Sequence, residues 1–239
     1  MVRAFQRVLG PQGTLLVPAF TYSFRNRPNT PPLDRRNSPG SRTGLFAETV
    51  RTHPSAHRSG HPTHSVAAIG GRAKEFTDGH ERISALGVGS PMHKAAEAGG
   101  HILLIGVTHN RNSSIHIGEV LAGVPYSTVH FCEDWGRTGR IVGTTGRVEE
   151  IPLHPEIPGC SRGFDAIDPY LRAGGVIVQG RIGNAATMFM KGLDLLAVVR
   201  DVLMESPALL LCDNLDCEAC TRRKAVAAAA TVWKNERGV

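Results

Sequence analysis

The chain has 239 residues, of which 41% are hydrophobic and 20% are charged, as is typical of a globular protein. No apolar run approaches the roughly 18 residues of a membrane-spanning helix, and the first residues lack the apolar core of a signal peptide. The formal net charge of +6 favours an anionic partner, such as nucleic acid, a membrane surface or a phosphorylated cofactor. Scattered cationic residues and an aromatic content of 5% argue against nucleic acid. We therefore expect a soluble cytoplasmic protein with no nucleic-acid or membrane partner.

Apolar periodicity and turn residues predict helices and strands that alternate along the chain. Such alternation predicts an α/β protein, which we expect to be a single-domain α/β/α sandwich over residues 1–239 with a central mixed sheet. Residues 25–42, rich in Pro, Asn, Arg and Ser, are expected to form a long surface loop. Residues 212–239 are expected to form a tail that contains cysteines and ends in a solvated helix. We expect helices over residues 2–9, 46–52, 91–97, 113–122, 164–172 and 191–205. Strands are expected over 14–18, 65–69, 102–107 and 176–178, with a polar strand pair around residues 140–151.

The cysteines are five in number, which is odd, in a chain too large to need disulfides. Cys212, Cys217 and Cys220 form a C-x4-C-x2-C pattern. Structural zinc takes four ligands, and the fourth would have to come from the distant Cys132, Cys160 or a histidine. We therefore expect reduced thiols on a terminal turn, with no metal site and any zinc substoichiometric.

Three segments combine reactive side chains with turn residues. The first, residues 58–70, reads R-S-G-H-P-T-H-S-V-A-A-I-G, the second joins G-V-G-S-P at 87–91 to G-G-H-I-L-L-I-G at 99–106, and the third, residues 113–119, reads S-S-I-H-I-G-E. In this order and spacing they resemble the R-S-x-H-P-x-x-S-x-x-A-x-G and T-x-L-H-x-x-E stretches of the aminoglycoside 3-N-acetyltransferases. Residues 159–164 and the turn at 183–185 extend the resemblance over nearly the whole chain.

Two features depart from the pattern of this family. Ser113 stands where the family usually has Thr, a change that keeps the hydroxyl group. Family members also usually carry a further helix and strand before the segment that opens this chain, and a His-Ser-Ser-Leu-like turn of that unit helps to hold coenzyme A. We therefore expect either that the start was assigned late or that the sequence is a fragment.

The resemblance implies acetyl transfer from acetyl-coenzyme A, as co-substrate, to the 3-amino group of a 2-deoxystreptamine aminoglycoside in a ternary complex. It assigns His116 as the general base, because imidazole titrates near neutral pH and only a neutral amine attacks a thioester. Glu119, three residues later on one helix face, is the nearest carboxylate that could orient the imidazole, although such neighbours need not be bonded. The Ser113 hydroxyl or backbone N–H groups would stabilise the oxyanion.

The resemblance also implies the residues that bind the two substrates. Arg58, Ser59, His61 and Ser65 are expected to form a coenzyme surface, in which Arg58 meets a phosphate, and the alternative is a solvated turn with an N-cap-like serine. Because aminoglycosides are polycations and this chain is basic, the amine pocket must be locally acidic. Its expected residues are Glu133, His154 and Glu156 as substrate-binding groups, with Glu48, Glu119 and Asp134 as further sources of negative charge.

Two other readings stay open at this point. The chain could acylate another amine metabolite, or be a non-catalytic or truncated family member that acts as a binding module. A serine hydrolase is a weaker third hypothesis, because the sequence contains no G-x-S-x-G elbow. The sequence leaves open whether the chain also pairs with itself as a homo-oligomer.

Overall fold

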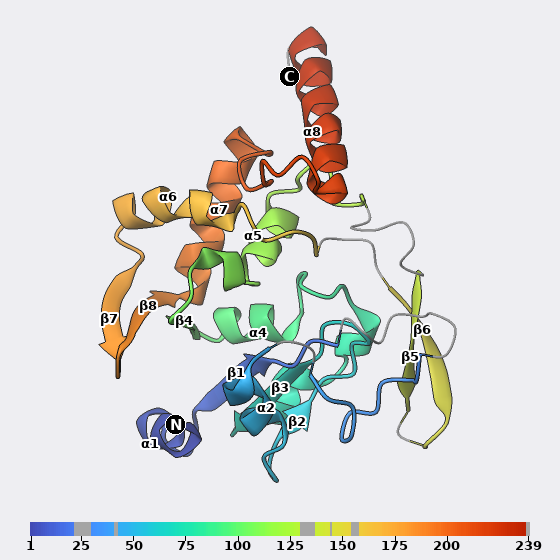
Figure 1. The fold of residues 1–239 in the computed structure, drawn as a ribbon, viewed down its shortest axis with the longest axis vertical. Coiled ribbons are helices and arrows are strands. Elements are labelled where there is room, and N and C mark those ends of the chain that lie inside the picture. Colours follow the sequence, from blue (N-terminus) through green and yellow to red (C-terminus); the bar gives the residue numbers. More distant parts are fainter. Residues whose placement is uncertain (22–29, 41–42, 130–136, 144, 154–157, 238–239) are drawn as a thin grey trace. The chain divides into compact units, whose positions relative to one another are not determined.

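A computed structural model describes residues 1–21, 30–40, 43–129, 137–143, 145–153 and 158–237. The contacts group the chain into two compact units, each assembled from segments that are distant in sequence (Figure 1). Unit 1 consists of Met1–Ala85, Gly89–Lys94 and Glu133–His154. Unit 2 consists of Leu86–Val88, Ala95–Cys132 and Pro155–Val239. The expectation of a single domain stays a prediction.

A three-stranded antiparallel sheet forms the centre of unit 1, with strand order β1-β3-β2. Its strands are β1 (Thr14–Pro18), β2 (His57–Arg58) and β3 (Val66–Gly70), and Thr14 pairs with Gly70 at one end of the β1–β3 ladder. Residues 66–69 are at most 1% exposed, because helices cover the sheet and the two alanines let them approach closely. These helices are α1 (Val2–Leu9), α2 (Leu45–Arg51) and α3 (Ala73–Thr77).

A second antiparallel pair in unit 1 joins β5 (Thr138–Val142) to β6 (Val148–Pro152), drawn in yellow in Figure 1. Leu33 lies beside β5, where its backbone N–H donates to the Arg140 carbonyl at 2.8 Å and its side chain is fully buried with Ile141. Part of the predicted surface loop at 25–42 is therefore packed against a strand. Residues 22–29 and 41–42 lie outside the described residues.

The sheet of unit 2 is also antiparallel and has the strand order β4-β8-β7. Its strands are β4 (His101–Ile105), β7 (Val178–Ile182) and β8 (Ala185–Lys191). Ile182 pairs with Ala185 across a two-residue Gly-Asn turn, in which Gly183 adopts the left-handed φ of 58° that hairpins of this length require. The turn was expected from the sequence, whereas β8, the strand that follows it, was not.

The helices of unit 2 carry most of its apolar core. α5 (Ile115–Leu121) packs against α7 (Gly192–Glu205), and Gly118 makes this close approach possible: a Cβ atom there would lie 2.4 Å from Val199 Cγ1. The remaining helices are α6 (Asp168–Ala173), α8 (Glu218–Arg237) and the short 3-10 helices at His109–Arg111 and Phe164–Ile167. Two further elements, α4 (Pro91–Glu97) and the 3-10 helix at His80–Arg82, complete the chain order.

The α/β class is confirmed, but the expectation of one central mixed sheet is wrong for the described strands, which form three separate antiparallel sheets. Alternating helices and strands do not by themselves fix how strands pair. Here β5–β6 and β7–β8 join neighbours in sequence as hairpins instead of parallel crossovers. No helix in the part of the chain that the structure describes is both long and apolar enough to span a membrane.

Candidate active site

His116 and Glu119 lie one turn apart on α5, and both are buried, with exposures of 4% and 1%. His116 Nδ1 is 2.5 Å from Glu119 Oε2. An ionised carboxylate only accepts hydrogen bonds, so Nδ1 carries the proton in this contact and Nε2 is the nitrogen without one. The two residues that the sequence places one turn apart are therefore hydrogen-bonded.

Tyr126 supports the other oxygen of this carboxylate. Its hydroxyl is 3.1 Å from Glu119 Oε1 and 2.8 Å from the Pro207 carbonyl oxygen, so one phenolic proton is shared between two acceptors. Burial, and then the charge of Glu119, raise the pKa of Tyr126, which therefore stays a neutral phenol. The Phe164 ring meets the His116 ring edge-on, with ring centroids 4.8 Å apart. These contacts fix both members of the pair.

Arg223 on α8 is a supporting residue that the sequence did not single out. The helix that ends the chain was expected to be solvated, which is wrong for Arg223, since it is 1% exposed. Its Nη2 donates to the Val129 carbonyl at 2.9 Å, and its guanidinium carbon lies 5.7 Å from the Tyr126 ring centroid. The available signal was helical spacing: Cys220, Arg223 and Ala227 share one face and are all buried.

Ser113 precedes α5, and its carbonyl accepts the His116 backbone N–H at 3.2 Å. Its side chain is partly buried. The structure thus places Ser113 one turn before His116. Its role as an oxyanion donor stays a prediction.

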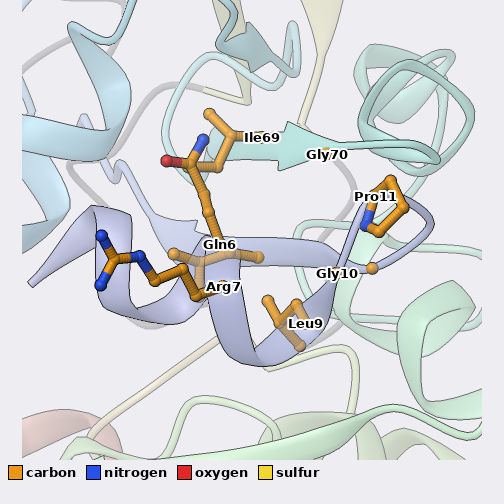
Figure 2. Close-up of a pocket in the computed structure, with 9 residues that line it drawn as sticks. Gln6, Arg7, Leu9, Gly10, Pro11, Ile69 and Gly70 are labelled. Carbon is orange, nitrogen blue, oxygen red and sulfur yellow. The ribbon is translucent and has the colours of Figure 1, made fainter.

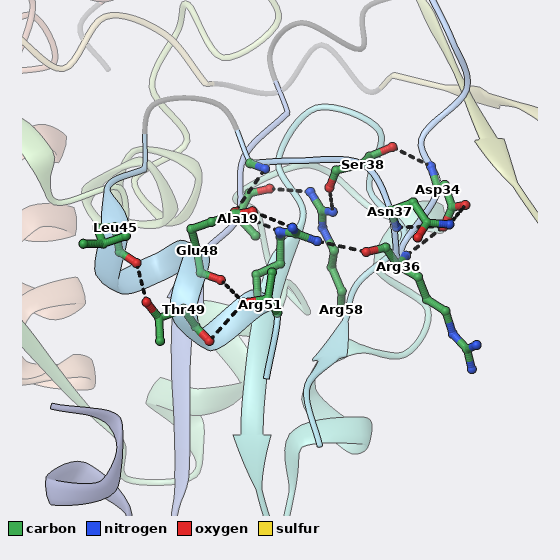
Figure 3. A network of polar contacts seen from close by, with 12 residues as sticks. Ala19, Asp34, Arg36, Asn37, Ser38, Leu45, Glu48, Thr49, Arg51 and Arg58 are labelled. Carbon is green, nitrogen blue, oxygen red and sulfur yellow. Dashed lines mark hydrogen bonds and ion pairs between the residues drawn. The ribbon is translucent and has the colours of Figure 1, made fainter. Parts of the chain in front are cut away.

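Arg58 and Ser65 belong to a buried polar network in unit 1, shown in Figure 3 around Arg58. Arg58 Nε donates to Ser65 Oγ at 3.0 Å and Nη2 to the Ala19 carbonyl at 3.0 Å, while Nη1 donates to the Ser38 carbonyl. Burial lowers the pKa of Arg58 to about 10. These bonds tie strand β2 to the chain after β1, and each guanidinium nitrogen donates to one protein acceptor.

Ser59 and His61 lie in a second buried cluster of unit 1. Ser59 Oγ is 2.9 Å from His80 Nδ1, and His80 Nε2 is 2.9 Å from the Ala85 carbonyl, so Nε2 carries the proton and Nδ1 accepts the Ser59 hydroxyl. The His61 ring lies against the His80 ring, with centroids 4.9 Å apart, and His61 Nδ1 accepts the His64 backbone N–H at 3.1 Å. Burial lowers the pKa of His80 to about 4.

The burial of the segment from Arg58 to Ser65 tests the alternative to a coenzyme surface that the sequence left open. The solvated-turn interpretation of the segment from Arg58 to Ser65 is wrong, because all four predicted residues are 8% exposed or less. Their contact with a coenzyme stays a prediction. Glu48, a proposed source of negative charge, is paired with Arg51, whose Nε is 2.8 Å from Glu48 Oε2, and this bond lowers the pKa of Glu48 (Figure 3).

Comparisons with known proteins give the chain its family. The family model described as aminoglycoside 3-N-acetyltransferase matches residues 1–204. The chain belongs to this family. Aminoglycoside N(3)-acetyltransferase IV of Salmonella sp is 27% identical over 212 residues, which cover 88% of this chain and 76% of that protein. Aminoglycoside N(3)-acetyltransferase III of Salmonella sp is 30% identical over 139 residues, and the match spans 49% of its length.

Solved structures of acetyltransferases agree with this membership. A histidine-to-alanine variant of AAC(3)-IVa in complex with a gentamicin superimposes with a TM-score of 0.79 at 25% identity, covering 94% of this chain and 82% of that one. AAC-IIIb, solved as a binary complex with CoASH, gives a TM-score of 0.72 at 27% identity and covers 86% of this chain and 82% of its own. This family therefore includes solved complexes with each of the two ligand classes.

The acetyltransferase site is incomplete within the described residues. Glu133, His154 and Glu156, the expected substrate-binding residues of this family member, lie outside them, as does Asp134. A pocket of about 430 Å³ in unit 1 is lined by α1, the turn after it, β1 and β3 (Figure 2). Its described lining contributes Gln6 and Arg7 as polar side chains but neither a histidine nor a carboxylate, so we do not assign amine chemistry to it.

Proposed function

We propose that this chain transfers the acetyl group of acetyl-coenzyme A to the 3-amino group of a 2-deoxystreptamine aminoglycoside, with His116 as general base. The buried His116–Glu119 pair, in a chain of this family, is the observation that carries the proposal. The complexes of related enzymes with a gentamicin and with CoASH support the two substrate classes.

The proposed chemistry needs no covalent enzyme intermediate. The lone pair of His116 Nε2 accepts a proton from the substrate amine, whose nitrogen attacks the thioester carbonyl carbon. Glu119 accepts the Nδ1 hydrogen bond throughout and balances the positive charge that the ring gains. The tetrahedral oxyanion is stabilised by the Ser113 hydroxyl or by backbone N–H groups. Collapse breaks the C–S bond, coenzyme A leaves as a thiolate, and the proton held by His116 neutralises it.

Charge accounts for how a basic chain can use a cationic acceptor. The net charge of +6 suits the phosphates of the coenzyme, whereas the polycationic aminoglycoside needs local carboxylates. We assign this part to Glu133 and Glu156, with His154 as a further polar contact. Arg58, Ser59, His61 and Ser65 are proposed to shape the coenzyme-binding segment through the buried bonds described above.

In the direct test, the purified chain is incubated with acetyl-coenzyme A and gentamicin, and the release of the coenzyme A thiol is measured. We expect thiol release that depends on gentamicin, and a product carrying one acetyl group on the 3-amino nitrogen by mass spectrometry and NMR. Gentamicin already acetylated at that nitrogen is the matched control and should be inert.

The alternatives from the sequence give different results in the same assay. Binding of acetyl-coenzyme A by calorimetry without turnover would support a non-catalytic binding module. Turnover with other amines, but not with aminoglycosides, would support an acyltransferase for another metabolite. Absence of coenzyme binding by folded protein would refute the enzymatic proposal.

A further inference from the structure

Four cysteine sulfurs converge at one point of unit 2. Cys212, Cys217 and Cys220 come from the segment that leads into α8 and from its first turn, and Cys160 comes from the segment before the 3-10 helix at Phe164–Ile167. All four Sγ atoms lie within 4.8 Å of one another. The sequence analysis named Cys132, Cys160 or a histidine as the source of a fourth ligand, and the structure places Cys160 beside the other three cysteines.

The sulfurs are close enough together for a tetrahedral metal site, since every pair lies within 4.8 Å. A metal–sulfur bond of about 2.3 Å places the sulfurs of a tetrahedral site about 3.8 Å apart. Cys160 Sγ and Cys212 Sγ are 3.7 Å apart, whereas a disulfide would hold them at about 2.05 Å. An iron–sulfur cluster places several irons and inorganic sulfides between the thiolates, for which this spacing leaves too little room.

The two chain segments are shaped to bring the sulfurs together. A Cβ atom on Gly163 would lie 2.5 Å from the Leu210 carbonyl oxygen and 3.0 Å from the Cys212 nitrogen, so only glycine lets the segment that carries Cys160 approach this closely. The Arg162 backbone N–H donates to Cys160 Sγ at 3.4 Å, a bond that orients a thiolate and offsets its charge. Cys212 and Cys220 are buried, with exposures of 7% and 1%.

We propose that Cys160, Cys212, Cys217 and Cys220 bind one zinc ion in a closed structural site. Four thiolates are the donor set that structural zinc takes in proteins, and four protein ligands leave no open position for a substrate. Three of the four cysteines lie beyond residue 204, where the match to the family model ends.

The zinc ion connects the two segments and fixes the start of α8. Arg223 lies one turn after Cys220 on the same helix face and packs against Tyr126, which in turn holds Glu119. Zinc bound at the start of α8 therefore keeps Arg223 against Tyr126, the residue that holds Glu119. The zinc ion thus acts on the His116–Glu119 pair only by positioning α8.

The first test is the metal content of the full chain, purified without chelators from zinc-supplemented medium. We expect about one zinc per chain by elemental analysis. Chain grown with Co²⁺ instead should show the thiolate-to-cobalt charge-transfer and intense visible bands of a tetrahedral tetrathiolate site. Metal far below one per chain, a cobalt spectrum without these bands, or an intact mass two hydrogens lower from a Cys160–Cys212 disulfide would overturn the proposal.

Paired variants locate the site. Cys217→Ser should reduce the retained zinc by roughly tenfold or more and lower the melting temperature, and a chelator should destabilise the wild-type chain but not this variant. Cys132→Ser, which changes the fifth cysteine of the chain, is the matched control and should keep both zinc and stability. Zinc lost from the Cys132 variant and kept by the Cys217 variant would refute the assignment. These readouts need no substrate, so they are independent of the proposed acetyl transfer.

Discussion

Each of the two units contains a buried, hydrogen-bonded histidine, and the two histidines differ in the charge of their hydrogen-bond partners. In unit 1, His80 is bonded through Nδ1 to the Ser59 hydroxyl and through Nε2 to the Ala85 carbonyl, and burial lowers its pKa to about 4. In unit 2, His116 faces the Glu119 carboxylate through Nδ1. A buried histidine between neutral partners stays neutral, whereas a buried carboxylate can balance the charge of a ring that has taken up a proton.

The difference also weakens the hydrolase hypothesis. Ser59 and His80 have the serine–histidine contact of a nucleophilic pair, but both are fully buried and both ring nitrogens of His80 are already bonded. A nucleophile needs access to a substrate, and its base needs a pKa near the working pH. We therefore interpret the Ser59–His80 pair as structural support for the segment between β2 and β3.

The largest expected effect comes from replacing the two histidines in turn. His116→Gln should lower kcat by about 10² to 10⁴-fold, because that is what positioned proton transfer contributes, while the affinity for acetyl-coenzyme A stays unchanged. His80→Gln, the matched control, should leave kcat within a few-fold for the protein that folds. Steady-state kinetics and calorimetry on both variants test this. Near-wild-type acetylation by a folded His116→Gln protein would show that the base is another group.

The second effect concerns pH and belongs to unit 1. Because the pKa of His80 drops from 6.5 to about 4 on folding, the unfolded chain takes up a proton that the folded chain excludes. The contribution of His80 to the free energy of unfolding is therefore fully present above pH 6.5. It is lost as the pH falls from 6.5 to about 4, and the whole loss is about 3 kcal/mol. Urea unfolding of the wild type and His80→Gln across this range measures it. The variant should show a shallower loss, and equal slopes would contradict the assignment.

A smaller effect should come from the packing beneath α5 in unit 2. Gly118→Ala places a methyl group 2.4 Å from Val199 Cγ1, and such overpacking typically costs about 1–3 kcal/mol. The displaced helix should also lower kcat, since it carries both His116 and Glu119. Val199→Ala in the same chain removes the nearer clashing atom, while the Cβ of residue 199 stays 2.6 Å from the new methyl group, and it should recover part of both losses. Chemical unfolding and kinetics on the double variant check this, and simple additivity of the two substitutions would refute the proposed contact.

The smallest effect is expected at the hydroxyl of Tyr126. Tyr126→Phe removes its bonds to Glu119 and Pro207 and should destabilise unit 2 by about 1 kcal/mol. Turnover should fall by a few-fold without a change in KM for acetyl-coenzyme A, because the residue positions Glu119 and contacts neither substrate. Tyr126→Leu should add the loss of the ring that Arg223 packs against. An unchanged kcat in the Phe variant would remove Tyr126 from the proposed positioning group.

Local patterns in the sequence predicted much of the fold and part of the site. The strand at Thr14–Pro18, the helix at Pro91–Glu97 and the β5–β6 pair follow from periodicity and turn residues, and His116 with Glu119 follows from a short motif on one helix. The missed features depend on contacts between distant residues. β8 pairs with β4, more than 80 residues earlier, and no local pattern encodes that partner.

The same reason explains Arg223 and Cys160. An arginine in a basic tail predicts a solvated face, and only packing against Tyr126 and the Val129 carbonyl gives it a buried partner. Likewise, Cys160 lies 52 residues from Cys212 in sequence, and its approach depends on the missing side chain of Gly163. Arg58 is a further case: the family motif gave no sign of its bonds to Ser65 and to the Ala19 carbonyl, which come from other segments, while its contact with a coenzyme stays a prediction.

The bonds that support Glu119 close long loops of the chain. Tyr126 and Pro207 are 81 residues apart, and Arg223 and Val129 are 94 residues apart. Such contacts form late when a chain folds, because the entropy of closing a long loop must be offset by surfaces already in place. We therefore expect the local His116–Glu119 bond to form early on its helix, and the contacts that hold it in place to form last. During refolding, acetyltransferase activity should return more slowly than helical circular dichroism.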